Sequence, residues 1–258
     1  MSRAQVQPVE ARPQDLPVKA DLARLRVAYR KDSRLAYLGH LDLIATIERC
    51  VRRAGLPFSI GNGFARRMRI QFSSALPVGA SSACEYFDLR LDESVDPDEA
   101  LVALRGATPR ALEPFRAAYV PGRLPALEAW LDRASWEIEL VGCGARAEEL
   151  LNAVELVRGR GTLTYLRGEK EKRVDVASTL VSLAAKEGEG GLCVSLETRS
   201  SNAGALRPQV LLSAALGEIG CELPAATRIR RCAQRHEEDG RLVEPFGPFG
   251  KTGETSVS

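Results

Sequence analysis

The chain has 258 residues, a formal net charge of +2, 45% hydrophobic residues and 27% charged residues. This composition is typical of a globular protein and excludes an intrinsically disordered chain of high net charge. The sequence contains neither an apolar run of about 18 residues nor the apolar region of a signal peptide, so we expect a cytoplasmic protein without a membrane partner.

Both ends of the chain are rich in proline, glycine and polar residues. Pro8, Pro13 and Pro17 stand among polar residues, which predicts a disordered leader over residues 1–21. The segment from Pro245 onward predicts a disordered tail over residues 245–258.

The first part of the ordered region, residues 22–122, has the predicted order strand, helix, strand, strand, helix, strand. LRVAYR alternates apolar and basic residues as a half-buried strand does. Apolar residues three and four positions apart predict an amphipathic helix over 41–54, with Leu41 on its buried face. The remaining elements are expected at 67–73, 84–91, 96–107 and 111–121. This order is typical of a ferredoxin-like domain.

A second set of elements in the same order is expected over residues 123–244. We expect strands at 135–141, 161–168, 172–178, 191–199 and 226–234, and helices at 145–157 and 207–219. In this interpretation the segments 161–168 and 172–178 form a strand pair. The sequence therefore predicts an α+β fold of two tandem ferredoxin-like (βαββαβ) domains between disordered tails.

The six cysteines are dispersed, and no two lie within ten residues of each other. This spacing lacks the CxxC pairs of zinc sites and the spacing of iron–sulfur ligands. Dispersed cysteines are usually small buried hydrophobes, so we expect no metal and no cofactor.

Positive charge is concentrated near the start of the chain. Residues 24–69 contain eleven basic and three acidic residues, a local excess of eight positive charges. Such asymmetry favours a polyanionic partner. The candidate RNA-binding residues are Arg52, Arg53, Phe64, Arg66, Arg67 and Arg69. Guanidinium groups would bind phosphates and Phe64 would stack on a base. The alternative is a solvated basic face without a ligand.

His40 is one of two histidines in the chain and lies in the stretch YLGHLDL. A histidine in a turn is a candidate general base, because its unperturbed pKa lies near physiological pH. The alternative is a structural residue at the start of a helix, where its ring satisfies backbone groups or contacts Asp42.

Five short motifs resemble the radical-SAM-linked family, a domain of unknown function. They are Gly39-His40-Leu41-Asp42, residues 52–57, Gly63-Phe64, Leu76-Pro77-Val78-Gly79 and Glu85-Tyr86-x-Asp88. The resemblance implies structural roles for Gly39, Asp42, Gly63, Pro77, Gly79, Glu85, Tyr86 and Asp88. The second histidine of the family pattern is absent here, and the chain has Arg66-Arg67-Met68-Arg69 in that block. This exchange favours binding over catalysis.

The resemblance also implies a link to RNA metabolism and a separate radical SAM protein as partner. The chain lacks the CxxxCxxC motif, so it cannot hold the radical SAM cluster itself. The leading hypothesis is an RNA-binding accessory protein that works with a radical SAM enzyme in the modification or processing of RNA, such as transfer RNA. One alternative is a metal-free RNA-processing or RNA-modifying enzyme that uses His40. Another is a protein–protein adaptor that binds no nucleic acid.

Overall fold

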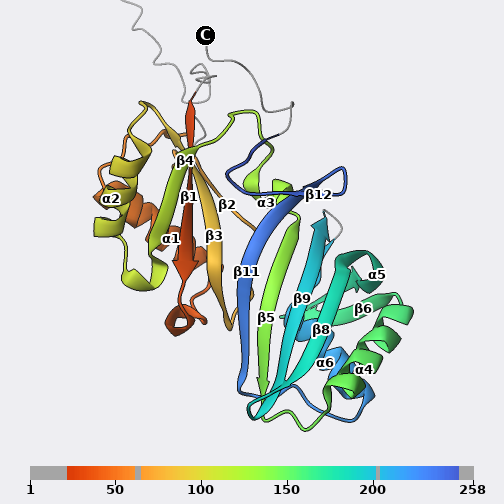
Figure 1. Cartoon of the computed structure of the whole chain (residues 1–258). Helices are drawn as coiled ribbons and strands as arrows, with labels where there is room; N and C mark the ends of the chain where they lie inside the picture. Colours follow the sequence, from red (N-terminus) through yellow and green to blue (C-terminus); the bar gives the residue numbers. More distant parts are fainter. Residues whose placement is uncertain (1–21, 62–64, 202–203, 250–258) are drawn as a thin grey trace, which may run out of the picture.

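The computed structural model describes residues 22–61, 65–201 and 204–249. The expected leader at 1–21, Gly63, Phe64 and residues 250–258 of the expected tail lie outside these ranges. The described residues form a mixed α+β fold with six α-helices and a ten-stranded sheet (Figure 1).

The N-terminal half contains four strands and two α-helices. These are β1 (Ala23–Lys31), α1 (His40–Arg53), β2 (Ile70–Phe72), β3 (Ala80–Leu91), α2 (Pro97–Ala107) and β4 (Pro114–Tyr119), with single 3-10 turns at Ser33–Leu35 and Arg110–Leu112. The strands lie in the order β4-β1-β3-β2, and each neighbouring pair is antiparallel. Asp96 begins α2 by accepting hydrogen bonds from the backbone N–H groups of Asp98 and Glu99.

The C-terminal half repeats this arrangement with different residues. Its main elements are β5 (Arg133–Val141), α4 (Ala147–Gly159), β8 (Leu180–Gly188), β9 (Gly191–Ser201), α6 (Pro208–Glu218) and β11 (Thr227–Glu238). The strands lie in the order β11-β5-β9-β8, again with antiparallel neighbours. It also contains a two-stranded hairpin over residues 162–175 and four short elements: α3 (Leu127–Trp130), α5 (Val176–Thr179), β10 (Gly204–Ala205) and β12 (Arg241–Val243).

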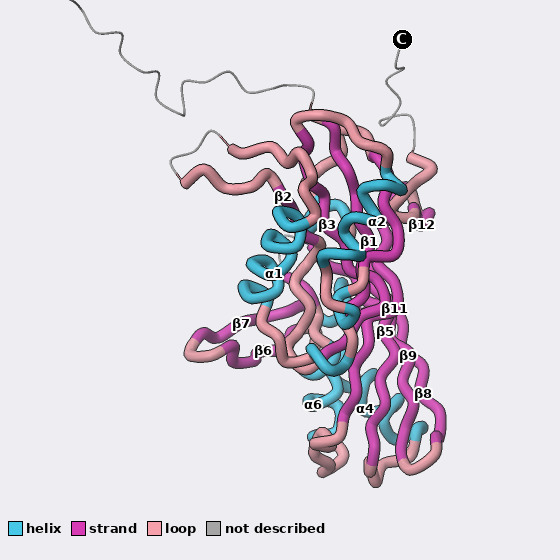
Figure 2. The backbone as a smooth tube through the Cα atoms, turned by 90° about the vertical axis from the view of Figure 1, so that its left-hand side faces the viewer, coloured by secondary structure: helices cyan, strands magenta, loops and turns pink. Residues whose placement is uncertain are grey.

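The expected strand pair at 161–168 and 172–178 does form, but it does not join the main sheet. β6 (Thr162–Arg167) and β7 (Lys170–Asp175) make a separate two-stranded sheet. Figure 2 shows this hairpin projecting from the main sheet on the same side as α1. β8, which the sequence analysis did not predict, takes the edge position beside β9. Its sequence, LVSLAAKEG, lacks a regular apolar–polar alternation and is a weaker strand signal than the hairpin.

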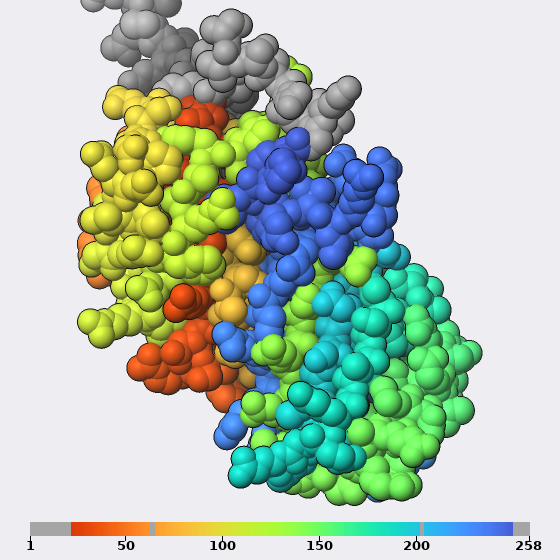
Figure 3. All heavy atoms as spheres, viewed as in Figure 1, coloured from red at the N-terminus to blue at the C-terminus, as the bar shows by residue number. Residues whose placement is uncertain are grey.

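The two halves share one sheet because β11 also pairs with β3. Ile229, Arg230 and Arg231 lie parallel to Ala80, Ser81 and Ser82. β3 is long enough to pair with β2 near its end and with β11 near its start. Figure 3 shows residues of β11 and the following segment, in blue, lying between the two halves.

Each half has a core on the helix side of the sheet. In the N-terminal half, Leu25, Val27 and Phe87 pack beneath α1 and α2. The buried residues of α1 are Leu43, Ile47, Cys50 and Val51. Leu41, expected on this face, is 79% exposed, because it lies in the first turn of the helix and points away from the sheet.

The opposite face of the N-terminal sheet is covered by α3 and by the start of the expected tail. Tyr86 packs against Phe246, and Trp130 packs against Phe249. Residues 245–249 are therefore part of the packed structure and not of a disordered tail, since they cover an apolar surface of the sheet. No helix in the described ranges is long and apolar enough to cross a membrane.

Candidate nucleic-acid interface

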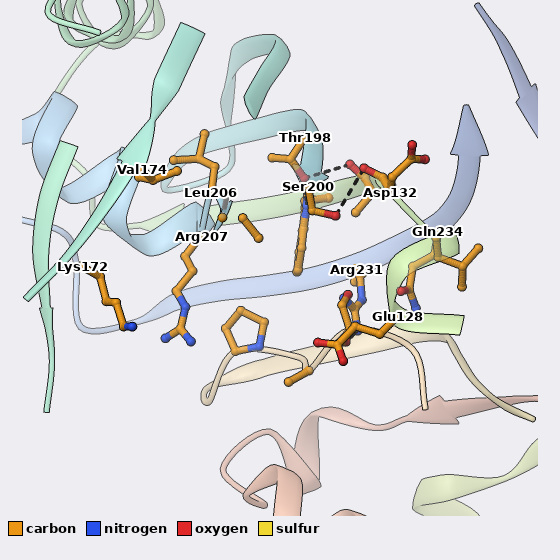
Figure 4. A pocket seen from close by; sticks show the side chains of 18 of the residues that line it. Glu128, Asp132, Lys172, Val174, Thr198, Ser200, Leu206, Arg207, Arg231 and Gln234 are labelled. Carbon is orange, nitrogen blue, oxygen red and sulfur yellow. Dashed lines mark hydrogen bonds between the residues drawn. The ribbon is translucent and has the colours of Figure 1, made fainter. Parts of the chain in front are cut away.

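A cleft of about 370 Å³ lies where the two halves meet (Figure 4). One wall comes from the loop before β3, at Ser74, Ala75 and Pro77, and from α3. The other wall comes from the β6–β7 hairpin and the start of α6, while β5, β9 and β11 form the floor. We call this space the cleft.

The wall formed by the hairpin and α6 is basic. Its cations are Arg167, Lys172, Arg173 and Arg207, of which Arg173 pairs with Glu171 over 3.2 Å. The acids that line the cleft are Glu128 and Asp132. Figure 4 shows the side chains of Lys172 and Arg207 extending into the same open space. Arg207 directly precedes α6, so its charge adds to the positive end of that helix dipole.

The floor of the cleft is rigid and already hydrogen-bonded. The indole N–H of Trp136 donates to Oγ1 of Thr198 over 3.0 Å. Arg231 lies over the Trp136 ring, 5.4 Å from its centre, and donates to the carbonyl of Ser74 over 2.9 Å. Trp136 is buried, whereas Tyr165 on the hairpin is half-buried and lines the cleft.

Gln234 contributes a buried acceptor to the cleft wall. Its Nε2 donates to the carbonyl of Cys84 over 2.6 Å and to Oγ of Ser73 over 3.3 Å. These contacts fix the orientation of the amide, because the reversed amide would place two acceptors together. Oε1 is buried and left without a partner among the described residues.

His40 does not line the cleft. It begins α1 behind the loop that forms the cleft wall, and its ring packs edge-on against Phe72 with centroids 6.3 Å apart. Within the described ranges its ring forms no hydrogen bond or ion pair. Tyr37, the nearest candidate nucleophile in sequence, is 82% exposed and lies against Gly79.

The stretch that leads to His40 is held by a buried lysine and a tight turn. Nζ of Lys31 donates to the carbonyls of Ala36 and Leu38 over 3.1 and 3.2 Å. Burial lowers the pKa of Lys31, while the charge of Glu85 acts in the opposite direction. The N–H of Gly79 donates to the carbonyl of Ala36 over 3.0 Å, so the Pro77–Gly79 motif is tied to the His40 loop.

The expected structural residues of β3 lie in buried ion pairs or apolar contacts. Glu85 accepts from Nε and Nη2 of Arg231 over 2.9 and 2.6 Å. Asp88, on the opposite face of the strand, accepts from Nε of Arg24 over 2.8 Å and from Nε of Arg26 over 2.7 Å. Near the start of α1, Asp42 is exposed and lies over Gly39: a Cβ on Gly39 would be 3.3 Å from Oδ2 of Asp42.

The predicted RNA-binding arginines form two groups with different neighbours. Arg52 pairs with Glu48 and Arg53 donates to the carbonyl of Ala107, both at the end of α1. The second group, Arg66, Arg67 and Arg69, lies in the segment before β2. Residues 67–69 pair with residues 59–61, whereas Arg66 precedes this pairing and has a φ of +41°. Phe64 lies outside the described residues.

The basic excess counted over residues 24–69 is not all on the surface. Arg24, Arg26 and Lys31 are buried and bind Asp88 or backbone carbonyls. The basic residues of β11 likewise have partners, because Arg228 pairs with Glu139 and Arg235 with Glu244. The basic residues counted in the sequence therefore include several whose charge is paired within the described part of the protein.

The sequence analysis missed the cleft because its lining comes from many separate segments. The available signal was the run YLRGEKEKR, in which basic residues flank a glycine turn between two strands. A hairpin that carries cations and an aromatic residue is a candidate polyanion contact in its own right.

A family model described as "Uncharacterized protein conserved in bacteria (DUF2344)" matches residues 24–208. No curated protein matches the sequence. Among solved structures, the chain is similar to one in "Crystal Structure of a Cbf5-Nop10-Gar1 Complex", with 9% identity and a TM-score of 0.43, covering 91% of this chain and 57% of that one. It is also similar to one in the archaeal box H/ACA sRNP Nop10-Cbf5 complex, with 9% identity and a TM-score of 0.40, covering 85% and 50%.

An unknown protein from Galdieria sulphuraria has a TM-score of 0.26 and 11% identity, covering 82% of this chain and 98% of that one. The chain spans about half the length of the first two solved chains that it matches.

Proposed function

We propose that this chain, which belongs to the DUF2344 family of uncharacterized proteins conserved in bacteria, is an RNA-binding accessory protein that uses the cleft. The observation that supports this proposal is the basic wall formed by the β6–β7 hairpin and the start of α6. We also interpret each half as a ferredoxin-like unit, on the basis of the strand orders β4-β1-β3-β2 and β11-β5-β9-β8.

The cleft combines the groups that single-stranded nucleic acid requires. Lys172 and Arg207 supply charge for the phosphates of the backbone, which dominate the affinity of such complexes. Tyr165 supplies an aromatic face on which a base can stack, a contact worth about 1–3 kcal/mol.

The proposal is tested by the binding of a labelled single-stranded RNA to the whole chain at several KCl concentrations. We expect affinity to fall steeply as salt rises. The double variant Lys172→Gln/Arg207→Gln should bind at least about tenfold more weakly, with a salt slope smaller by about 1–2, because two phosphate contacts are lost.

The matched control is Arg146→Gln/Arg228→Gln, which removes two positive charges outside the cleft. Both arginines are exposed and lie in surface ion pairs with Glu149 and Glu139, and such pairs add little stability. The control should bind RNA nearly as well as the wild type. Equal weakening in both double variants, or no salt-dependent binding by the wild type, would contradict the proposal.

An accessory protein also needs a surface for its partner. Tyr37, Leu41 and Val78 are 82%, 79% and 61% exposed, and they belong to the motifs around His40 and Gly79. Large exposed apolar side chains near one another favour protein contact. This observation also favours the adaptor alternative, in which the protein contact is the whole function.

The proposed partner is a separate radical SAM enzyme, which the motif resemblance implies and the family description does not mention. The test is the rate of RNA modification by such an enzyme with and without this chain. A Leu41→Ser/Val78→Ser variant should bind RNA normally and fail to stimulate the enzyme. The enzymatic alternative predicts RNA turnover by the chain alone and loss of that turnover in His40→Ala.

A further inference from the structure

A row of three arginines crosses the back face of the N-terminal sheet, on the side away from α1 and α2. Arg24 of β1 lies opposite Arg90 of β3. Arg69, in the next strand, lies on the other side of Arg90, whose N–H donates to the carbonyl of Arg69 over 2.9 Å. We call Arg24, Arg90 and Arg69 the arginine row.

The neighbouring row on the same face holds one acid. Asp88 lies between Arg26 and Gln71 in the register of the three strands. Its carboxylate is already bound by Arg24 and Arg26. The two rows therefore hold four arginines and one carboxylate. Like charges directly opposite each other on a sheet are destabilising, so each guanidinium requires its own partners.

Two members of the arginine row have such partners within the chain. Arg24 donates to the carbonyls of Leu124 and Pro125 over 2.6 and 2.8 Å, in addition to Asp88. Arg90 donates to the carbonyls of Leu22 and Gly122 over 3.1 and 2.9 Å. Burial lowers the pKa of Arg90, and the charges of Arg24 and Arg69 lower it further, while Asp88 opposes this.

Arg69 differs from these two. Its Nε is buried and has no hydrogen-bond partner among the described residues. Burying a charged donor without an acceptor costs more than burying a neutral one. Arg69 and Arg90 line an open pocket of about 340 Å³, together with Ile70, Gln71 and Asp88. The pocket thus has an excess of positive charge and room for a ligand.

We infer that this pocket is a phosphate-binding site, in which Arg69 is the principal ligand and Arg90 adds charge. A phosphate would bind the guanidinium group of Arg69 beside that of Arg90, and Gln71 adds an amide to the same pocket. The site lies on the face of the sheet away from α1, and its lining shares no residue with that of the cleft, so it is independent of the proposed function. The phosphate could belong to an RNA backbone or to a free phosphate.

The test is a titration of the whole chain with inorganic phosphate at constant ionic strength, followed by calorimetry and by thermal unfolding. The wild type should bind one phosphate saturably and unfold at a higher temperature in its presence. Arg69→Gln should weaken this binding at least about tenfold, which corresponds to about 1.4 kcal/mol. Arg67→Gln, which removes an exposed charge two residues away, should bind phosphate as the wild type does.

A second measurement separates loss of the site from loss of the fold. Without phosphate, Arg69→Gln should be at least as stable as the wild type, because the substitution removes one of several neighbouring positive charges. Absence of saturable phosphate binding by the wild type, or equal weakening in Arg69→Gln and Arg67→Gln, would overturn the inference.

Competition with a short single-stranded RNA then identifies the source of the phosphate. Displacement of phosphate by RNA in the wild type, with weaker RNA binding in Arg69→Gln, supports a backbone phosphate. Retention of phosphate in the presence of RNA supports a free phosphate. Phosphate binding should persist in Lys172→Gln/Arg207→Gln, so the two proposals can fail separately.

Discussion

The ion pair between Glu85 and Arg231 fixes the junction of the two halves at the scale of single residues. Both side chains are buried, and Arg231 also donates to the carbonyl and hydroxyl of Ser74. A buried charge that has lost its partner is costly, whereas a well-packed apolar pair often replaces a buried ion pair at little cost. The pair therefore contributes specificity of arrangement more than net stability.

Replacing Arg231 with Met should lower the free energy of unfolding by about 3–5 kcal/mol, because Glu85 would remain buried without a partner. The double variant Glu85→Leu/Arg231→Met should recover a large part of this loss. Urea unfolding of the wild type, both single variants and the double variant measures the coupling. Additive losses in the double variant would contradict this account of the pair.

Cys84 makes the free energy of unfolding depend on pH in alkaline solution. Burial, and next the charge of Glu85, raise the pKa of this thiol from its ordinary value of 9.0 to about 12. The thiol of the unfolded chain ionises near pH 9, so the contribution of Cys84 to stability is complete below pH 9 and is lost as the pH rises toward 12. Between these values the free energy of unfolding should fall more steeply in the wild type than in Cys84→Ala. Parallel pH profiles would show that the folded thiol ionises normally.

At the scale of elements, the turn before β3 depends on one glycine. Gly79 has a φ of +88°, and the N–H of Ala80 donates to the carbonyl of Pro77 over 3.1 Å, as in a type II turn. A Cβ on Gly79 has space, since its nearest neighbour would be Tyr37 at 3.9 Å, so the cost of a side chain is conformational. Gly79→Ala should destabilise the protein by about 1–2 kcal/mol.

The control for this prediction is a glycine with ordinary backbone geometry. Gly106 lies in α2, and a Cβ there would contact nothing within 4 Å. Gly106→Ala should stabilise the protein by up to about 1 kcal/mol, because alanine loses less backbone entropy in a helix. Thermal unfolding of both variants should give shifts of opposite sign. A neutral result at Gly79 would mean that the turn adopts another conformation.

The elements differ in how well the sequence predicts them. α1 and β1 have clear periodicities, and the predicted helix over 41–54 matches α1 to within one residue at each end. The predicted buried faces are only partly right, because Leu41 is exposed and both faces of β1 are buried, Arg24 and Arg26 included. The hairpin β6–β7 resembles the central strands in pattern, and its exclusion from the sheet depends on β8, whose residues Ala184 and Ala185 give little signal. Which strand occupies the edge is decided by tertiary packing.

The candidate site was less predictable than the fold, for a related reason. A basic residue in the sequence has the same charge whether it is exposed or paired, so Arg24 and Arg26 counted as surface cations until their contacts with Asp88 were known. Conversely, Lys172 and Arg207 are 35 positions apart, and the fold brings them to one cleft. Local sequence patterns contain no information on such long-range contacts.

At the scale of the whole molecule, β11 makes one cooperative unit of the two halves. It pairs with β5 of its own half and with β3 of the other, and the side chain of Gln234 donates to the carbonyl of Cys84 across the same junction. Separation of the halves would break the ion pair between Glu85 and Arg231. We therefore expect the two halves to unfold together.

The two tryptophans allow a direct test, because Trp130 covers the N-terminal sheet and Trp136 lies in the C-terminal core. In Trp136→Phe the fluorescence of Trp130 reports the N-terminal half, and in Trp130→Phe that of Trp136 reports the C-terminal half. Within each variant, the urea transition by fluorescence should coincide with that by far-UV circular dichroism, as a two-state unit requires. Both probes are compared within one variant, so the effect of the substitution on stability is the same for both transitions. Transitions that separate would mean that the pairing of β11 with β3 is weaker than either core, and that the cleft between the halves opens before the protein unfolds.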